Sequence, residues 1–170
     1  MSNIFQMVMD LAKRSLFVDY NVIDQRANGY SCWFGDIKTY TVNIRDLSFD
    51  REDEIDCEML FMNLSDALVW GVEGAFKYLG GREKVELSAE EKRMFEDIMY
   101  LAKRNISIDY SIEPRDKNVL AYGIHVRKVW TFGAPIDVTP FDDLYEGMKK
   151  QIAIGKEYLK YQKEINNDDY

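Results

Sequence analysis

The chain has 170 residues and is acidic, with 30 Asp and Glu against 22 Lys and Arg and a net charge of −8. This charge repels phosphate backbones and argues against general nucleic-acid binding, while 46 % hydrophobic and 14 % aromatic residues argue against intrinsic disorder. The N-terminus lacks a signal-peptide pattern and no apolar run approaches the roughly 20 residues that span a bilayer, so we predict a cytoplasmic protein.

An internal repeat is predicted from two matches along the chain. Phe5–Tyr20 matches Phe95–Tyr110 at a shift of 90 residues, with Phe, Met, Leu-Ala-Lys-Arg and Asp-Tyr in common. Phe61–Leu79 matches Phe141–Leu159 at a shift of 80. We therefore predict two tandem units joined near Gly80 to Glu86: residues 1–82 with an acidic insertion, then residues 86–165, followed by an acidic tail, residues 166–170.

The first unit is predicted to open with an amphipathic helix, whose apolar face is Ile4, Phe5, Val8, Leu11 and Ala12. A strand follows, in which Leu16, Val18, Tyr20 and Val22 alternate with polar positions. The turn signal Asn28-Gly29 then leads to a returning strand over Tyr30–Phe34 and a third strand over Lys38–Ile44. The pattern leaves helix, strand and loop open for Glu52–Met62. A closing helix has an apolar stripe from Leu64 to Leu79 and ends at Gly80-Gly81.

The second unit is predicted to repeat this order. Ser88 and Glu91 form a capping box at the start of its first helix, whose apolar face runs from Met94 to Ala102. Strands are predicted over Ile106–Ile112, Val119–Trp130 and Pro135–Val138. Thr139 is expected to cap the closing helix, with Pro140 in the first turn and Asp142 completing the box. The prediction is an α+β fold of two α-β-β-β-α repeats, each with a small antiparallel sheet that helices cover on one face.

Residues that could carry catalysis or bind a metal or cofactor are not found in the sequence. His125 is the one histidine, and Cys32 and Cys57 lack the paired spacing of a zinc site. Phosphate-binding, dinucleotide and nucleophile-elbow motifs are missing. We predict no cofactor, no metal and no enzymatic activity, with His125 as a surface side chain and a general base as the alternative.

Two surfaces are candidates for binding a protein partner. The first is an acidic stretch of Asp46, Asp50, Glu52, Asp53, Glu54, Asp56 and Glu58, for which a solvated loop and a calcium loop are the alternatives. The second is the sheet face of the first unit opposite its helices, where Phe17, Asp19 and Trp33 are expected. These aromatic side chains fit either a partner-binding patch or a contact between units or chains.

The predicted order α-β-β-β-α resembles that of double-stranded-RNA-binding domains. Those domains grip phosphates with lysines at the start of the closing helix, whereas here Asp66, Asp142 and Asp143 stand at the corresponding turns. The element order, small size and acidity are also similar to phage-encoded anti-CRISPR inhibitors, which occupy the DNA site of a nuclease with carboxylates. We therefore predict a non-enzymatic interaction module, an inhibitor from a phage or mobile element that engages a nucleic-acid-binding host protein. The alternative is a homodimeric assembly protein that pairs through its open sheet faces.

Overall fold

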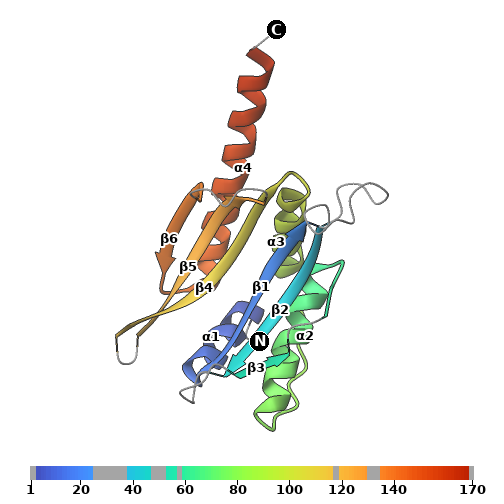
Figure 1. Cartoon of the computed structure of the whole chain (residues 1–170), viewed down its shortest axis with the longest axis vertical. Coiled ribbons are helices and arrows are strands. Elements are labelled where there is room, and N and C mark those ends of the chain that lie inside the picture. Colours follow the sequence, from blue (N-terminus) through green and yellow to red (C-terminus); the bar gives the residue numbers. More distant parts are fainter. Residues whose placement is uncertain are drawn as a thin grey trace.

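The computed structural model describes residues 3–24, 38–46, 53–56, 59–116, 119–129 and 135–168. These residues form an α+β fold with four helices and two small antiparallel sheets (Figure 1). The elements are, in chain order, α1 (Ile4–Lys13), β1 (Leu16–Asp24), β2 (Lys38–Asp46), β3 (Asp53–Asp56), α2 (Leu64–Tyr78), α3 (Ala89–Ala102), β4 (Ile106–Asp116), β5 (Val119–Lys128), β6 (Asp137–Phe141) and α4 (Leu144–Asp168).

The first sheet has the strand order β1-β2-β3. Strand β1 pairs with β2 from Leu16↔Asp46 to Asp24↔Lys38, so the predicted strand over Lys38–Ile44 is present as β2 and lies beside β1. The strand predicted over Tyr30–Phe34 lies outside the described residues. The third strand is β3, in the acidic stretch that the sequence left unassigned, because a carboxylate-rich segment carries no period-two apolar signal.

The second sheet has the order β4-β5-β6, and its last strand corrects one prediction. Thr139 and Pro140 belong to β6, where Pro140 pairs with Gly123, instead of starting a helix. A proline is tolerated there because β6 is an edge strand of this sheet. Helix α4 begins at Leu144, and the Asp143 carboxylate accepts a hydrogen bond from the Glu146 amide at 2.9 Å.

Two helix-end predictions are confirmed. The capping box of Ser88 and Glu91 is present at the start of α3. Gly80 has φ of 82° directly after α2 and its C-cap residue Leu79, a conformation that glycine adopts without strain. Both features fix where the link between α2 and α3 begins and ends.

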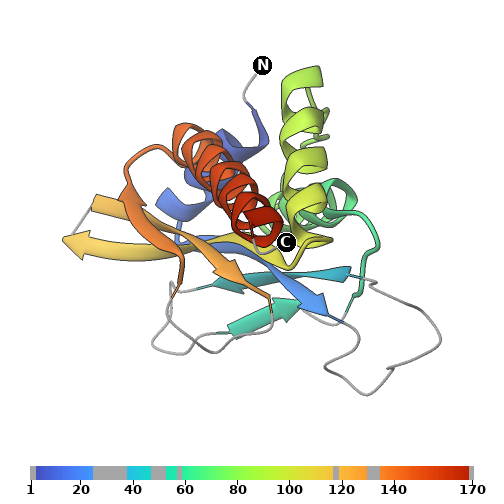
Figure 2. The ribbon, with the colours of Figure 1, turned by 90° about the horizontal axis from the view of Figure 1, so that it is seen from above.

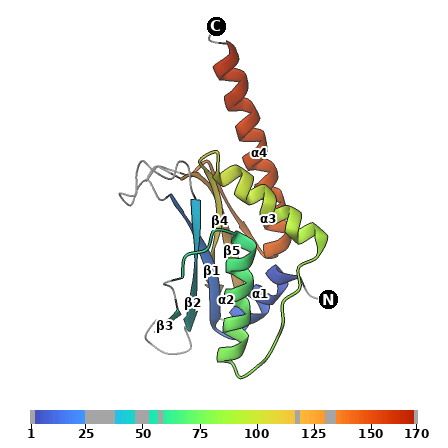
Figure 3. The same ribbon diagram turned by 90° about the vertical axis from the view of Figure 1, so that its right-hand side faces the viewer.

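The helices lie together on one side of the sheets, and Figures 2 and 3 show this layering from two directions. Core side chains from both layers form one buried cluster. Helix α2 approaches β2 closely at Gly71, where an added Cβ would collide with Val42. The close approach of α2 to β2 therefore explains why residue 71 is a glycine. None of the helices in the described part of the chain is both long and apolar enough to cross a membrane.

Strands β1 and β4 lie side by side where the two sheets meet (Figure 1). Tyr20 donates a hydrogen bond to the Ile108 carbonyl at 2.6 Å, and Tyr110 donates one to the Val18 carbonyl at 2.7 Å. Each tyrosine therefore bonds the residue two positions before the other tyrosine. The two rings meet edge to face with centroids 5.6 Å apart. Buried hydroxyl groups consequently bridge the two sheets.

The helix layer shows the same reciprocity. The Leu64 amide points at the Met99 sulfur at 3.5 Å, and the Leu144 amide points at the Met9 sulfur at 3.4 Å. Phe5 stacks on Phe95 with ring centroids 5.6 Å apart, and both residues are fully buried. Ser15 and Asn105, which follow α1 and α3, have φ of 62° and 63°. The two sequence matches align Phe5 with Phe95, Met9 with Met99 and Leu64 with Leu144, so aligned residues make equivalent contacts.

A carboxylate stabilises two helix starts at once. Glu91 is 2 % exposed and accepts hydrogen bonds from the Ile4 amide at 2.5 Å and from the Ser88 amide at 2.8 Å. Ile4 is the first residue of α1, and Ser88 caps α3. A negative charge at a helix N-terminus is favourable because free amide groups and the helix dipole point toward it.

Burial of tyrosines predicts that the protein loses stability in alkali. Desolvation raises the pKa of Tyr20 and Tyr110 well above the usual value, and raises the pKa of Tyr40 and Tyr122 to about 12. These tyrosines ionise near pH 10 in the unfolded chain and at higher pH in the folded chain, so they leave the free energy of unfolding unchanged below about pH 10 and lower it above that pH. Urea unfolding from about pH 8 to about pH 11 measures this fall. A flat profile, with every tyrosine of the folded protein titrating near pH 10, contradicts the expected linkage.

Candidate functional site

The candidate site lies on the outer face, which we define as the sheet face that points away from the four helices of the described chain. Two clusters of charged side chains lie there, one on β1 and β2 and one on β4 and β5. We call them the Asp19 cluster and the Asp109 cluster. Each contains a carboxylate on β1 or β4 and an arginine on the neighbouring strand, β2 or β5.

The Asp19 cluster contains Asp19, Asn43 and Arg45. The Asp19 carboxylate accepts a hydrogen bond from the Asn43 amide at 2.8 Å and pairs with the Arg45 guanidinium at 2.6 Å. The side chains of Asp19 and Arg45 are 12 % and 28 % exposed. The alternation of β1 places Asp19 outward because Val18 and Tyr20 face the helices.

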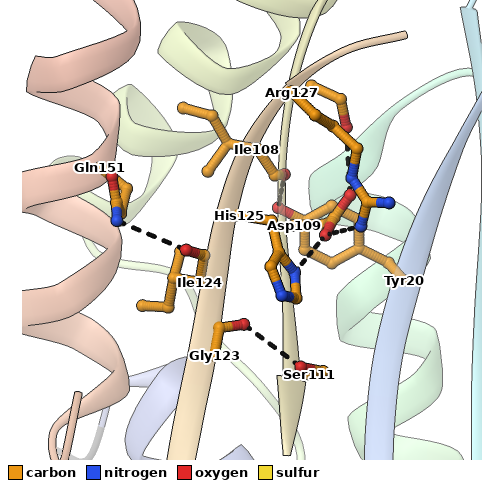
Figure 4. Close-up of polar contacts among 10 residues, drawn as sticks. Tyr20, Ile108, Asp109, Ser111, Gly123, Ile124, His125, Arg127 and Gln151 are labelled. Carbon is orange, nitrogen blue, oxygen red and sulfur yellow. Dashed lines mark hydrogen bonds and ion pairs between the residues drawn. The ribbon is translucent and has the colours of Figure 1, made fainter. Parts of the chain in front are cut away.

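The Asp109 cluster contains Asp109, Arg127 and His125, which Figure 4 shows, together with Ser107. One Asp109 oxygen lies 2.5 Å from the Arg127 guanidinium and 3.0 Å from His125 Nδ1. The other accepts a hydrogen bond from the Ser107 hydroxyl at 3.3 Å. The Asp109 side chain is 10 % exposed, whereas that of Arg127 is 46 % exposed. The carboxylate is therefore held inside the cluster while the cation reaches solvent.

A histidine beside a carboxylate can act as a general base that takes a proton from a nearby hydroxyl group. The acceptors that the neighbouring serine hydroxyls bond therefore show whether His125 is placed for this role. Ser107 donates to Asp109, and Ser111 donates to the Gly123 carbonyl at 3.4 Å (Figure 4). Both hydroxyls thus use acceptors other than His125. The geometry fixes charged groups on a sheet surface and does not aim a nucleophile at a base.

Several predicted partner-binding residues lie elsewhere than expected. Phe17 is 6 % exposed and belongs to the core cluster, so in the described chain it is not a surface anchor. Asp46 is 8 % exposed and accepts a hydrogen bond from the Tyr78 hydroxyl at 3.0 Å. The remaining candidates divide between the backbone of β3, which contains Asp53, Glu54 and Asp56, and positions outside the described residues, which are Trp33, Asp50, Glu52 and Glu58.

Sequence reasoning missed Asn43 and Arg45. A signal for them exists, because both alternate with the apolar residues of β2 and therefore face outward with Asp19. Across the described ranges, three or more His, Cys, Asp or Glu side chains never gather closely enough to hold a metal ion.

The two partners of the Asp109 cluster should differ in their effect on stability. Asp109→Ala leaves Arg127 and Ser107 without their buried acceptor and should lower the free energy of unfolding by about 2 kcal/mol. Arg127→Gln should lower it by less than about 1 kcal/mol, because the guanidinium is nearly half exposed. Chemical denaturation of both variants measures the difference, and a larger loss for Arg127→Gln would show that the cation, not the carboxylate, organises the cluster.

We compared the chain with protein-family models, with curated proteins and with solved structures, and none of them matches it.

Proposed function

We propose that this chain is a non-enzymatic protein-interaction module that binds a partner protein through its outer face. The observation that carries the proposal is the pair of pre-formed charged clusters there, whose carboxylates are held and whose arginines are partly exposed. Charged groups fixed before binding lose little conformational freedom in a complex. Electrostatic complementarity of this kind supports specificity and association rate.

The acidity of the whole chain, rather than the two clusters with their partly exposed arginines, favours a basic partner protein that binds nucleic acid. A net charge of −8 steers association toward a positive surface and away from phosphate backbones. An inhibitor encoded by a phage or mobile element, acting in the cytoplasm like the anti-CRISPR proteins it resembles, would have this character. The carboxylates of the acidic stretch belong to this proposal as further groups that would attract a basic partner.

Two tandem copies of one α-β-β-β-α unit would explain why the outer face carries its cluster twice. Asp19 and Asp109 are related by the shift of 90 that relates the two sequence matches. The reciprocal tyrosine and methionine contacts support this origin by duplication. One copy of the cluster has His125 where the other has Asn43.

A pull-down with a charge-matched control tests the proposed function. Asn21→Lys with Thr41→Lys adds two positive charges at facing positions of the outer face. Glu83→Gln with Glu86→Gln makes the same change in net charge on exposed residues of the link between α2 and α3, on the helix side (Figure 3). We expect a nucleic-acid-binding protein to be retained by the wild type and the control, less strongly at high salt, and to be lost by the outer-face variant. Equal retention by both variants, or retention that salt does not change, would contradict the proposal.

A homodimeric assembly protein is the second candidate, and α4 favours it. This helix extends beyond the sheets (Figure 1), and its Tyr161 and Ile165 are 62 % and 47 % exposed. Exposed apolar side chains on one extended helix suit pairing with a second copy. Sedimentation of the wild type and of a Tyr161→Ser, Ile165→Ser variant decides this, because assembly requires twice the chain mass of 20.0 kDa in the wild type only.

A further inference from the structure

We propose that the cavity between α2, α3 and the link joining them is a binding site for a tyrosine side chain presented by a partner protein. The cavity has a volume of about 360 Å³. Ser65, Val69, Val85, Leu87, Phe95 and Met99 form most of its wall. It lies in the helix layer, so it is independent of the function proposed for the outer face.

The second half of the chain shows what such a space holds. Tyr145 there lies against Phe5, with ring centroids 6.1 Å apart. Residue 145 follows Leu144, whose amide points at Met9, just as Ser65 follows Leu64, whose amide points at Met99. Phe95 corresponds to Phe5 at the shift of 90 between the two sequence matches, and the two rings stack on each other. Ser65 therefore stands beside Phe95 where a tyrosine stands beside Phe5.

The side chain of residue 65 or of its counterpart, residue 145, decides whether the space is filled. Serine ends at its hydroxyl, and the Ser65 hydroxyl is turned to the Asn63 side chain at 2.6 Å. The linker residues Val85 and Leu87 enclose the space without closing it, and Val85 is held by a hydrogen bond from its amide to the Glu73 carboxylate at 3.0 Å. The wall is thus formed by three aliphatic side chains and a thioether over the buried ring of Phe95.

The polar groups at the cavity suit a phenol. In the second half, partial burial and the nearby Glu90 carboxylate raise the pKa of Tyr145 to about 12, so the phenolic hydroxyl stays protonated beside a carboxylate. Asp66 and Glu96, both exposed, line the cavity in the first half and can accept a hydrogen bond from a phenolic hydroxyl. A tyrosine ring buries apolar area while its hydroxyl keeps a polar partner, which is why tyrosine is frequent at protein interfaces.

Titration of the full chain with p-cresol, the side-chain analogue of tyrosine, tests the site by backbone amide chemical shifts. We expect saturable binding with a dissociation constant of about 1 mM, and it should shift the amide signals of Leu87 and Met99. Ser65→Tyr fills the space and should weaken binding at least about tenfold, whereas Ser65→Ala leaves the space and should bind like the wild type. Tyr145→Ser opens the matching space beside Phe5 and should add a second p-cresol site.

A peptide arm tests the assignment to a protein partner. Acetyl-Gly-Tyr-Gly-amide should shift the same amide signals as p-cresol, and acetyl-Gly-Ala-Gly-amide should not. Equal p-cresol affinity in the wild type and in Ser65→Tyr, or unmoved signals of Leu87 and Met99, would overturn the site. Binding of p-cresol without binding of the tyrosine peptide would overturn its assignment to a protein segment.

Discussion

Replacing Glu91 with alanine is expected to lower the free energy of unfolding by about 3 kcal/mol. The change removes the acceptor of the Ile4 and Ser88 amides, which lie 2.5 Å and 2.8 Å from its oxygens. It also removes a buried negative charge from the starts of two helices. Since the carboxylate is 2 % exposed, water cannot replace it without opening the packing. Urea unfolding measures the loss.

Two matched variants show whether the carboxylate itself is responsible. Glu91→Gln keeps the shape and one acceptor oxygen but turns an amide group toward the second donor, so about half of the loss should remain. Glu86→Ala removes an exposed carboxylate five positions earlier and should change stability by less than about 0.5 kcal/mol. Equal effects of Glu91→Ala and Glu86→Ala would mean that the two helix starts do not depend on this group.

Phe5→Ala is expected to cost about 4 kcal/mol, the range found when a fully buried phenylalanine is truncated in a packed core. Phe5 has no exposed surface and contacts both Phe95 and Tyr145. Its removal leaves a cavity where the two halves meet, so both halves should lose stability together. Phe95→Ala should have a similar effect because it removes the other ring of the stack.

Calorimetry of these variants beside Tyr100→Ala provides the comparison. Tyr100 is an aromatic residue on α3 that is 41 % exposed, with the Arg104 guanidinium 3.5 Å from its ring centroid. Its loss should cost about 1 kcal/mol or less. A Phe5→Ala effect as small as that of Tyr100→Ala would show that the stacked rings do not form the core of the joint.

The sequence predicted those elements whose pattern is local. The helices around Phe5 and Phe95 have amphipathic spacing, and Ser88 with Glu91 marks a start that depends on only four residues. The alternation from Leu16 to Val22 likewise predicted β1. These signals survive in the structure because each one is made by neighbours along the chain.

The sequence predicted less accurately the elements that depend on pairing between strands. Strand β3 has no alternating pattern, so its carboxylate-rich segment becomes a strand through the ladder with β2. Thr139 and Pro140 satisfy the local rules for a helix start, yet the ladder with β5 takes both residues into β6. Tertiary pairing prevailed over local propensity in both cases.

The candidate site was predicted only in part, for a related reason. Asp19 and the residues of the Asp109 cluster could be assigned to the sheet face opposite the helices from alternation alone. The burial of Phe17 could not be predicted in this way, because alternation places a residue on a face but does not show how deeply its neighbours cover it. Alternation also places Arg45 on this face, but its position next to Asp19 follows only from the register of β1 with β2.

Denaturation of Tyr20→Phe, Tyr110→Phe and the double variant tests most directly whether the two halves are joined by equivalent contacts into one cooperative unit. Each single change removes one buried hydroxyl bond across the β1–β4 joint and should cost about 1 kcal/mol. The two losses should agree within about 0.5 kcal/mol, and every variant should unfold in a single transition. A loss confined to one tyrosine, or separate transitions for the two halves, would contradict the account.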